Sequence, residues 1–230
     1  SDTEAIAKVP SQQQGRECTA GKEWWRAGSQ PKRGGELVIG SSLFDHLDVT
    51  KAGRIAGFNQ VYTGLVAYRA CFFGDYAPIA PRLAKSWEVS PDAKTWTFKL
   101  RTDVKWQDLP PVNGRGFTAA DVAWTVDLQQ KEGLLRSFWQ GVTYTTPDPY
   151  TIVFQLPEAD ADFIGKVADY RNLILPHEIK EQKGDFRTLA VGTGSYILKE
   201  FRVSEWTQAE RNPNYWETGL DGKPLPYLDS

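Results

Sequence analysis

The side chains whose types best suit chemistry are Asp45, His46 and Asp48, where two carboxylates flank an imidazole. Such a group could act as an acid/base pair or supply metal ligands. A lone histidine in a loop is more often a surface or hydrogen-bonding residue, which weighs against catalysis here. Because the only other histidine is His177, a Cys/His zinc site lacks ligands unless carboxylates contribute. We therefore expect no metal site.

A partial dinucleotide-binding motif occurs at residues 114–119, where GRGFTA fits the pattern GxGxxA ahead of an expected helix. A true motif needs a buried strand directly upstream, but the preceding residues DLPPVN include two prolines, which cannot join a central strand. We interpret the segment as a loop before a helix. Since GxSxG, HExxH, Walker A and EF-hand patterns are absent too, the sequence predicts neither an enzyme nor a cofactor.

The composition is that of a globular protein, with 230 residues, 40% of them hydrophobic and 24% charged. The net charge of -2 provides no surface for a polyanion, which argues against nucleic acid as a partner. No apolar run approaches the roughly 20 residues of a membrane helix. The first residues do not resemble a signal peptide, so we expect a cytoplasmic protein or a mature form. Cys18 and Cys71 match no metal or redox motif.

The elements expected to position these residues begin after a polar extension, residues 1–33, whose Trp24-Trp25 pair should dock back on the protein. GELVIG at residues 35–40 suits a buried strand, and residues 41–48 suit a loop. Apolar residues at helical spacing predict a helix over residues 55–68. Nine tryptophans are present; most stand at core-facing positions, whereas Trp139 and the Trp24-Trp25 pair are candidates for a recognition surface.

Alternating apolar and polar residues in SWEVSPDAKTWTFKLRTDVKWQD, residues 86–108, predict an antiparallel hairpin, with a third strand at residues 150–156. Thr118 and Asp121 form a capping-box pattern that begins a helix, and Gly133 is suited to end it. Residues 161–170 and 177–184 predict short helices. Further strands are expected at residues 172–176, from Tyr196, and over residues 205–211.

Several segments together resemble one known family. PKRGGELVIG, APRLAKSWEVSPDAKTWTFKLRTDVKWQD, FTAADVAWTVD, DPYTIVFQLPEADADF, VGTGSYIL and ERNPNYW occur in the order found in the family 5 extracellular solute-binding proteins. The likeness runs from about residue 32 to residue 229, and an ordered series of motifs is far more specific than any one motif. These proteins are the dipeptide-, oligopeptide- and nickel-binding receptors of ABC importers.

The resemblance implies a mixed α+β fold: one lobe of a type II periplasmic-binding-protein clamshell, without the second lobe. Its core sheet would comprise residues 34–82 and 171–230, and a small antiparallel-sheet and helix subdomain would comprise residues 83–170. Because a clamshell closes both lobes around its ligand, one lobe should bind weakly or not at all. The family also implies an exported protein, periplasmic or tethered to the cell surface, that delivers a small peptide or other small solute to a membrane ABC permease.

The same resemblance suggests which residues line the ligand pocket, and each group also has a structural explanation. The loop 41–45 could simply turn the chain, and the glycines of residues 192–194 could supply positive φ angles. Arg171 needs an anionic partner, either a ligand carboxylate or an internal aspartate. The candidate ligand-binding residues are Ser41, Ser42, Phe44, Asp45, Tyr170, Arg171, Asn172, Gly192, Thr193 and Gly194.

An exported location and an even number of cysteines lead us to expect a disulfide between Cys18 and Cys71. Two further interpretations stay open. The chain could be a lobe retained as a structural or interaction subunit, with its cleft face covered by a protein partner. An enzyme based on Asp45, His46 and Asp48 is a more distant alternative.

Overall fold

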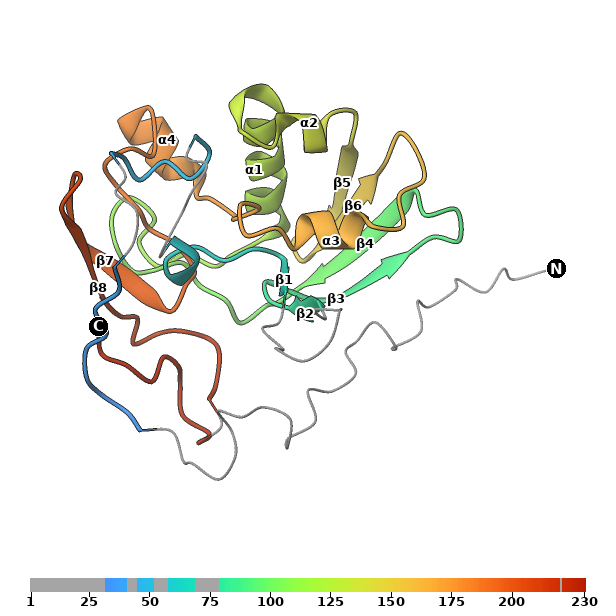
Figure 1. Cartoon of the computed structure of the whole chain (residues 1–230). Helices are drawn as coiled ribbons and strands as arrows, with labels where there is room; N and C mark the ends of the chain where they lie inside the picture. Colours follow the sequence, from blue (N-terminus) through green and yellow to red (C-terminus); the bar gives the residue numbers. More distant parts are fainter. Residues whose placement is uncertain (1–31, 41–44, 52–57, 69–78, 220) are drawn as a thin grey trace.

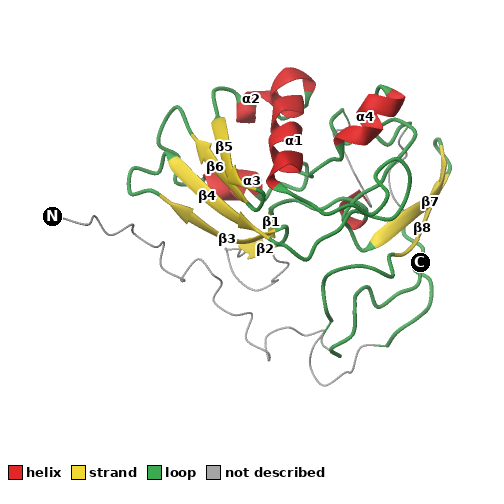
Figure 2. Ribbon diagram, turned by 180° about the vertical axis from the view of Figure 1, so that it is seen from behind, coloured by secondary structure: helices red, strands yellow, loops and turns green. Residues whose placement is uncertain are grey.

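The computed structural model describes residues 32–40, 45–51, 58–68, 79–219 and 221–230. Figures 1 and 2 show a four-stranded sheet on one side of the molecule, a two-stranded hairpin on the other, and the longest helix, α1, between them. The elements are the short 3-10 helix Phe58–Gln60, β1 (Val66–Tyr68), β2 (Ile79–Pro81), β3 (Ala84–Val89), β4 (Thr95–Leu100), α1 (Ala119–Glu132), α2 (Arg136–Trp139), β5 (Thr143–Asp148), β6 (Thr151–Gln155), α3 (Phe163–Val167), α4 (His177–Lys183), β7 (Tyr196–Arg202) and β8 (Trp206–Arg211).

The four-stranded sheet has the strand order β3-β4-β6-β5, and its neighbouring strands are antiparallel. The predicted hairpin is confirmed, since Trp87 lies opposite Phe98 in the β3–β4 pair, and the predicted third strand is β6. Strand β5 was not predicted. Its sequence TYTTPD has no apolar alternation and is almost wholly exposed, so it carries little of the signal that marks a half-buried strand.

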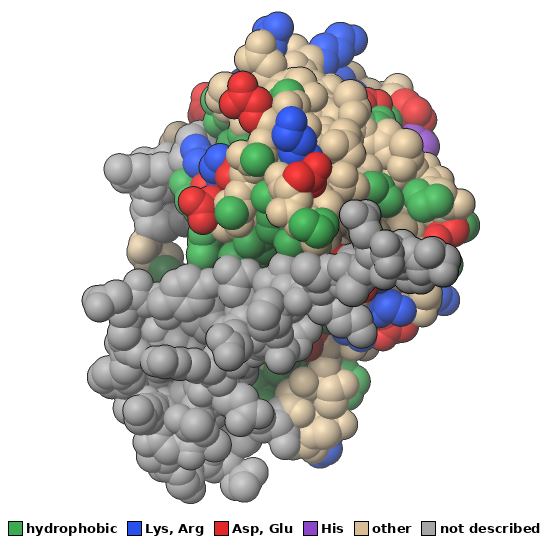
Figure 3. Space-filling model, turned by 90° about the vertical axis from the view of Figure 1, so that its right-hand side faces the viewer, with side chains coloured by type: hydrophobic (Ala, Val, Ile, Leu, Met, Phe, Trp, Pro, Cys, Tyr) green, Lys and Arg blue, Asp and Glu red, His purple; other side chains and the backbone are tan. Residues whose placement is uncertain are grey.

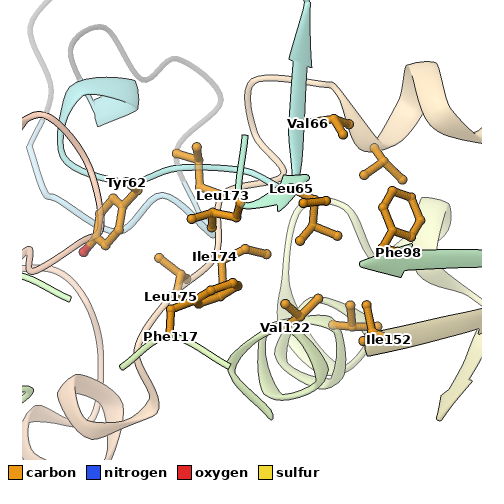
Figure 4. Close-up of a cluster of buried hydrophobic side chains, with 14 of the residues drawn as sticks. Tyr62, Leu65, Val66, Phe98, Phe117, Val122, Ile152, Leu173, Ile174 and Leu175 are labelled. Carbon is orange, nitrogen blue, oxygen red and sulfur yellow. The ribbon is translucent and has the colours of Figure 1, made fainter. Parts of the chain in front are cut away.

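Helix α1 begins as the capping pattern predicts and lies against the sheet. The Asp121 carboxylate accepts a hydrogen bond of 2.9 Å from the backbone N–H of Thr118, and Gly133 ends the helix. Val122 and Val126 on its inner face are buried. Figure 4 shows Val122 facing Phe98 and Ile152 of the sheet, with the segment carrying Leu173 nearby. A local capping signal and an apolar stripe therefore suffice to define this helix.

Tryptophan side chains complete this core. Trp96 is 2% exposed and Trp139 is 4% exposed. The indole N–H of Trp139 donates to Asn172 Oδ1 at 3.1 Å, and its ring lies 5.3 Å from that of Phe154. The expectation that Trp139 belongs to a recognition surface is wrong, because α2 folds it onto the sheet. Trp24 and Trp25 lie outside the described residues.

The two later helices and the terminal hairpin agree with the sequence, with α3, α4 and the β7–β8 pair where patterns predicted them. Residues 172–176 do not form a strand, although Leu173 bridges Gly64 and the segment is largely buried. The described part of residues 55–68 is not an α-helix: after the 3-10 turn, the chain runs extended into β1. Backbone pairing with distant segments outweighs local helical spacing there.

The expectation of a buried strand at GELVIG is wrong as well. Residues 35–40 are exposed, and the side chains of Leu37, Val38 and Ile39 are 57%, 85% and 72% accessible. Hydrogen bonds join this segment to the end of the chain, from Gly34 N to Tyr227 O and from Asp229 N to Gly35 O. An apolar run becomes a buried strand only where other strands and a covering layer meet it.

The surface seen in Figure 3 mixes acidic, basic and apolar side chains over its described part. This mixture agrees with the small net charge of -2 and gives that face no extended basic patch. Within the described ranges, no helix is both long enough and apolar enough to cross a membrane.

Candidate functional site

The glycine loop, residues 192–194, packs against the backbone of residues 60–62. Gly194 N–H donates to Val61 O at 2.8 Å. A Cβ atom on Gly192 would overlap Val61 O, and one on Gly194 would overlap Gln60 O. The structural explanation considered for these glycines, a positive φ angle, is wrong, because neither residue has one. They are instead required by the close approach of two backbones.

Almost all backbone polar groups of the glycine loop are bonded within the protein. Gln107 donates its backbone N–H to Gly192 O at 2.9 Å, and its side-chain Oε1 accepts from Gly192 N at 3.2 Å. The Trp216 indole N–H donates to Thr193 O at 3.2 Å, and Asn212 Nδ2 donates to Gly194 O at 2.9 Å. The loop therefore has a fixed backbone conformation.

The hydroxyl of Thr193 differs from these groups. The residue is 1% exposed, and within the part of the chain that the structure describes its Oγ1 has no hydrogen-bond partner. A buried hydroxyl without a partner lowers stability unless another group supplies a hydrogen bond. Thr193 is thus the member of the loop whose polar side chain is free to bond a ligand or a water molecule.

The second predicted group, residues 170–172, follows α3. The Arg171 guanidinium donates to both carboxylate oxygens of Asp169, from Nε at 2.8 Å and from Nη2 at 2.7 Å. Hydrogen bonds from Arg171 lower the pKa of Asp169, and the same pairing raises the pKa of Arg171. The internal aspartate considered as a partner is therefore present, while 38% of the Arg171 side chain stays exposed.

Tyr170 and Asn172 differ in how far solvent reaches them. Tyr170 is 48% exposed. Asn172 is buried, with its Nδ2 donating to Lys166 O and its Oδ1 accepting from Trp139. Arg171 and Asn172 line an open hollow of about 750 Å³, whose other walls come from the α2 region, residues 156–160 and α3.

At the third predicted group, Asp45 is described, whereas Ser41, Ser42 and Phe44 lie outside the described residues. The neighbouring Asp48 is 5% exposed, and its carboxylate accepts from both the N–H and the hydroxyl of Thr50, at 2.9 and 2.6 Å. His46 Nδ1 accepts from Asp48 N at 3.1 Å. These bonds give the cluster a structural role in a turn, and the described residues contain no group of side chains that could hold a metal ion.

Two of the three predicted groups of site residues, the glycine loop and residues 170–172, lie next to the same segment, residues 61–63. The glycine loop bonds to Val61, and residue Ile174, just beyond the second group, donates to Thr63 O at 3.1 Å. The two groups thus lie along the same extended segment, but the glycine loop does not line the hollow beside Arg171. The predicted disulfide stays a prediction, because Cys18 and Cys71 lie outside the described residues.

Two residues next to the site were not singled out from the sequence. Gln107 lies near the end of the stretch 86–108, beyond the last residue of β4, and is 2% exposed. Arg115 donates to Asp121 from Nη1 at 3.0 Å and from Nη2 at 2.6 Å, and also bonds Glu178 at the start of α4. Their partners are distant in the chain or on another element, so residue type and local spacing carry no signal for these roles.

The fold described above is similar to that of solved substrate-binding proteins of ABC transporters. The DppA periplasmic binding protein from Helicobacter pylori, solved with the peptide STSA, superimposes with a TM-score of 0.71 at 25% identity over 86% of this chain and 42% of that chain. The oligopeptide-binding protein AppA from Bacillus subtilis, solved with a nonapeptide, gives 0.69 at 24% identity over 87% of this chain and 40% of its own, which supports the fold.

Residues 78–230 match the family described as "Bacterial extracellular solute-binding proteins, family 5 Middle", and the chain belongs to this family. The nickel-binding periplasmic protein of Escherichia coli is 32% identical over 161 residues, 69% of this chain and 30% of the relative. The periplasmic oligopeptide-binding protein OppA of Haemophilus influenzae is 32% identical over 159 residues, 60% of this chain and 29% of the relative. The chain therefore spans about a third of the length of these relatives.

Proposed function

We propose that this chain is the first lobe of a receptor that binds a peptide or similar small solute outside the cytoplasm and delivers it to an ABC permease. The observation that carries the proposal is the family match over residues 78–230. Similar proteins are named for binding peptides or nickel. We favour a peptide because the described residues lack a cluster that could hold a metal ion, and because two structurally similar proteins were solved with peptides.

Within this proposal, Thr193 and Arg171 contribute differently to the solute site. The Thr193 hydroxyl is buried and lacks a partner in the described structure, so a hydrogen bond from a solute would satisfy it. Arg171 is partly exposed, and its guanidinium is well suited to a carboxylate, such as the C-terminus of a peptide. Asp169 already holds that guanidinium in place.

The proposal is tested by purifying the protein at its natural length from its own host, denaturing it, and identifying the released solutes by mass spectrometry. We expect peptides, whose affinity for the emptied protein is then measured by calorimetry. Arg171→Gln should weaken a peptide with a free C-terminus more than its C-terminal amide. A protein that releases no solute and binds none from a peptide pool would refute the function.

The exposed residues Leu37, Val38 and Ile39 favour a second function, that of an interaction subunit whose apolar face a protein partner covers. Size-exclusion chromatography of the natural-length protein distinguishes the two. A receptor should elute as a monomer that shifts little on adding solute, whereas an interaction subunit should elute with a second chain and bind no solute.

A further inference from the structure

We propose that Gln107 is a positioning residue for the solute site: through it, the segment between β4 and α1 sets the conformation of the glycine loop. This inference rests on the proposed function. Gln107 is buried, and both polar groups of its side chain are already bonded, Oε1 to Gly192 N and Nε2 to Tyr196 O, so it offers no group to a solute. It would act on binding only through the residues it holds.

The contacts of Gln107 with the loop are made by both its backbone and its side chain. Its backbone N–H donates to Gly192 O at 2.9 Å, while Oε1 accepts from Gly192 N at 3.2 Å and Nε2 donates to Tyr196 O at 2.7 Å. Gln107 therefore bonds the chain on both sides of Thr193, at Gly192 and at Tyr196. A buried amide with donor and acceptor both engaged fixes the position of its partners, because leaving either one unpaired is costly.

Gln107 is itself held by the segment that follows β4. Leu109 N–H donates to Gln107 O at 2.8 Å, and Trp106 N–H donates to Arg115 O at 3.0 Å. Phe117 N–H donates to Val104 O at 3.1 Å, which ties the same segment to the start of α1. These bonds hold residues 104–109 against the segment that leads into α1, and Gln107 joins residues 104–109 to the glycine loop.

The side chain whose orientation depends on these contacts is that of Thr193. Its neighbours on both sides are fixed by Gln107 and by the 60–62 backbone, so the direction of its buried hydroxyl depends on them. If Gly192 moves, the hydroxyl moves with it. Loss of the Gln107 side-chain bonds should therefore lower solute affinity by about tenfold, a typical size for coupling between two sites.

Gln107→Met removes both side-chain hydrogen bonds at similar volume. Gln130→Met is a matched control, because Gln130 Nε2 also donates to two backbone carbonyls, of Trp139 and Val142, at 2.9 and 2.7 Å. Both variants of the natural-length protein are compared for hydrogen exchange, urea midpoint and affinity for the peptide that the wild type selects from a tetrapeptide pool.

We expect Gln107→Met to speed amide exchange over residues 191–196 and to weaken peptide binding about tenfold. Gln130→Met should lower the urea midpoint comparably and leave exchange over residues 191–196 unchanged; it is a control for exchange and stability alone, because Val142 lines the hollow beside Arg171. Equal acceleration of exchange over residues 191–196 in the two variants, or an unchanged affinity or exchange rate in Gln107→Met, would overturn the inference. A wild type that binds no peptide refutes the proposed function instead, and the exchange comparison still decides whether Gln107 holds the loop.

Discussion

Replacing Arg115 by Met tests how the loop carrying Gln107 is anchored. The Asp121 side chain is 2% exposed, and the guanidinium of Arg115 supplies the bond to its Oδ1. The same guanidinium reaches Glu178, whose side chain is 16% exposed. The variant would therefore leave two carboxylates without their cation, one of them buried.

The magnitude follows from this burial. Removing one partner of a fully buried ion pair costs about 3–5 kcal/mol. Because 31% of the Arg115 side chain is exposed, water can approach the carboxylates from that side, and we reduce the expected loss to about 2–3 kcal/mol. For a chain of this size, that loss corresponds to a fall in Tm of roughly 5–10 °C.

Urea unfolding followed by tryptophan fluorescence measures the loss, with Lys199→Gln as the control. Lys199 pairs with Glu210 at 3.3 Å with both side chains about half exposed, so this variant should lose less than about 1 kcal/mol. Adding Asp121→Asn to Arg115→Met should restore part of the stability, because it removes the buried charge and keeps an oxygen for the Thr118 N–H. The reasoning is wrong if Arg115→Met loses no more than the control, or if the double variant is no more stable than the single one.

Four further outcomes are expected. Thr193→Val should leave the urea midpoint unchanged or raised, since it removes a buried hydroxyl that has no partner in the described part of the chain; a loss above about 1 kcal/mol would reveal an intramolecular partner. Gly194→Ala should lose about 1–3 kcal/mol in the same assay through overlap with the 60–62 backbone, and a neutral result would contradict that packing. Burial is the largest single influence on Glu178 and raises its pKa, but the hydrogen bonds and charge of Arg115, together with a backbone hydrogen bond and the charge of His177, lower that pKa on balance. The pair with Arg115 therefore stabilises the fold above about pH 4.5 and does so less as the pH falls. Glu178→Gln should weaken the loss of stability at acid pH, and an unchanged loss would count against the pair. Alkylation without reductant, followed by mass spectrometry, should label neither Cys18 nor Cys71, and two labelled thiols would exclude their disulfide.

The elements that the sequence predicted correctly are those whose signals are local. Thr118, Asp121 and Gly133 mark both ends of α1 within the helix itself, and the alternation around Trp96 defines β4 without reference to any other segment. Each of these patterns can be recognised within a single helix or hairpin. Their physical cause lies within a few residues of the chain.

The incorrect predictions concern segments whose structure is decided by distant partners. The spacing of Val61, Tyr62 and Leu65 fits a helix, but bonds from Gly194 to Val61 and from Ile174 to Thr63 hold this segment extended. For the candidate site, the family resemblance singled out the glycine loop, and its part in ligand binding stays a prediction; the reason for its glycines, contact with the 60–62 backbone, follows only from the fold. The sequence did not indicate the role of Gln107, because the bonding partners of its side chain lie more than 80 residues away, for example Gly192 at a separation of 85.

The bonding of the glycine loop limits how it could recognise a solute. The N–H and C=O groups of Gly192 and Gly194 and the C=O of Thr193 are engaged with Gln107, Val61, Asn212 and Trp216. Under the proposed function, a solute would therefore meet a loop of fixed backbone, and the buried Thr193 hydroxyl, which has no partner among the described residues, is the side-chain group left to bond it. Because the loop is already ordered, binding there would cost little conformational entropy. It would also provide few polar contacts, so discrimination among peptides should depend on side chains elsewhere, with Arg171 the first to test.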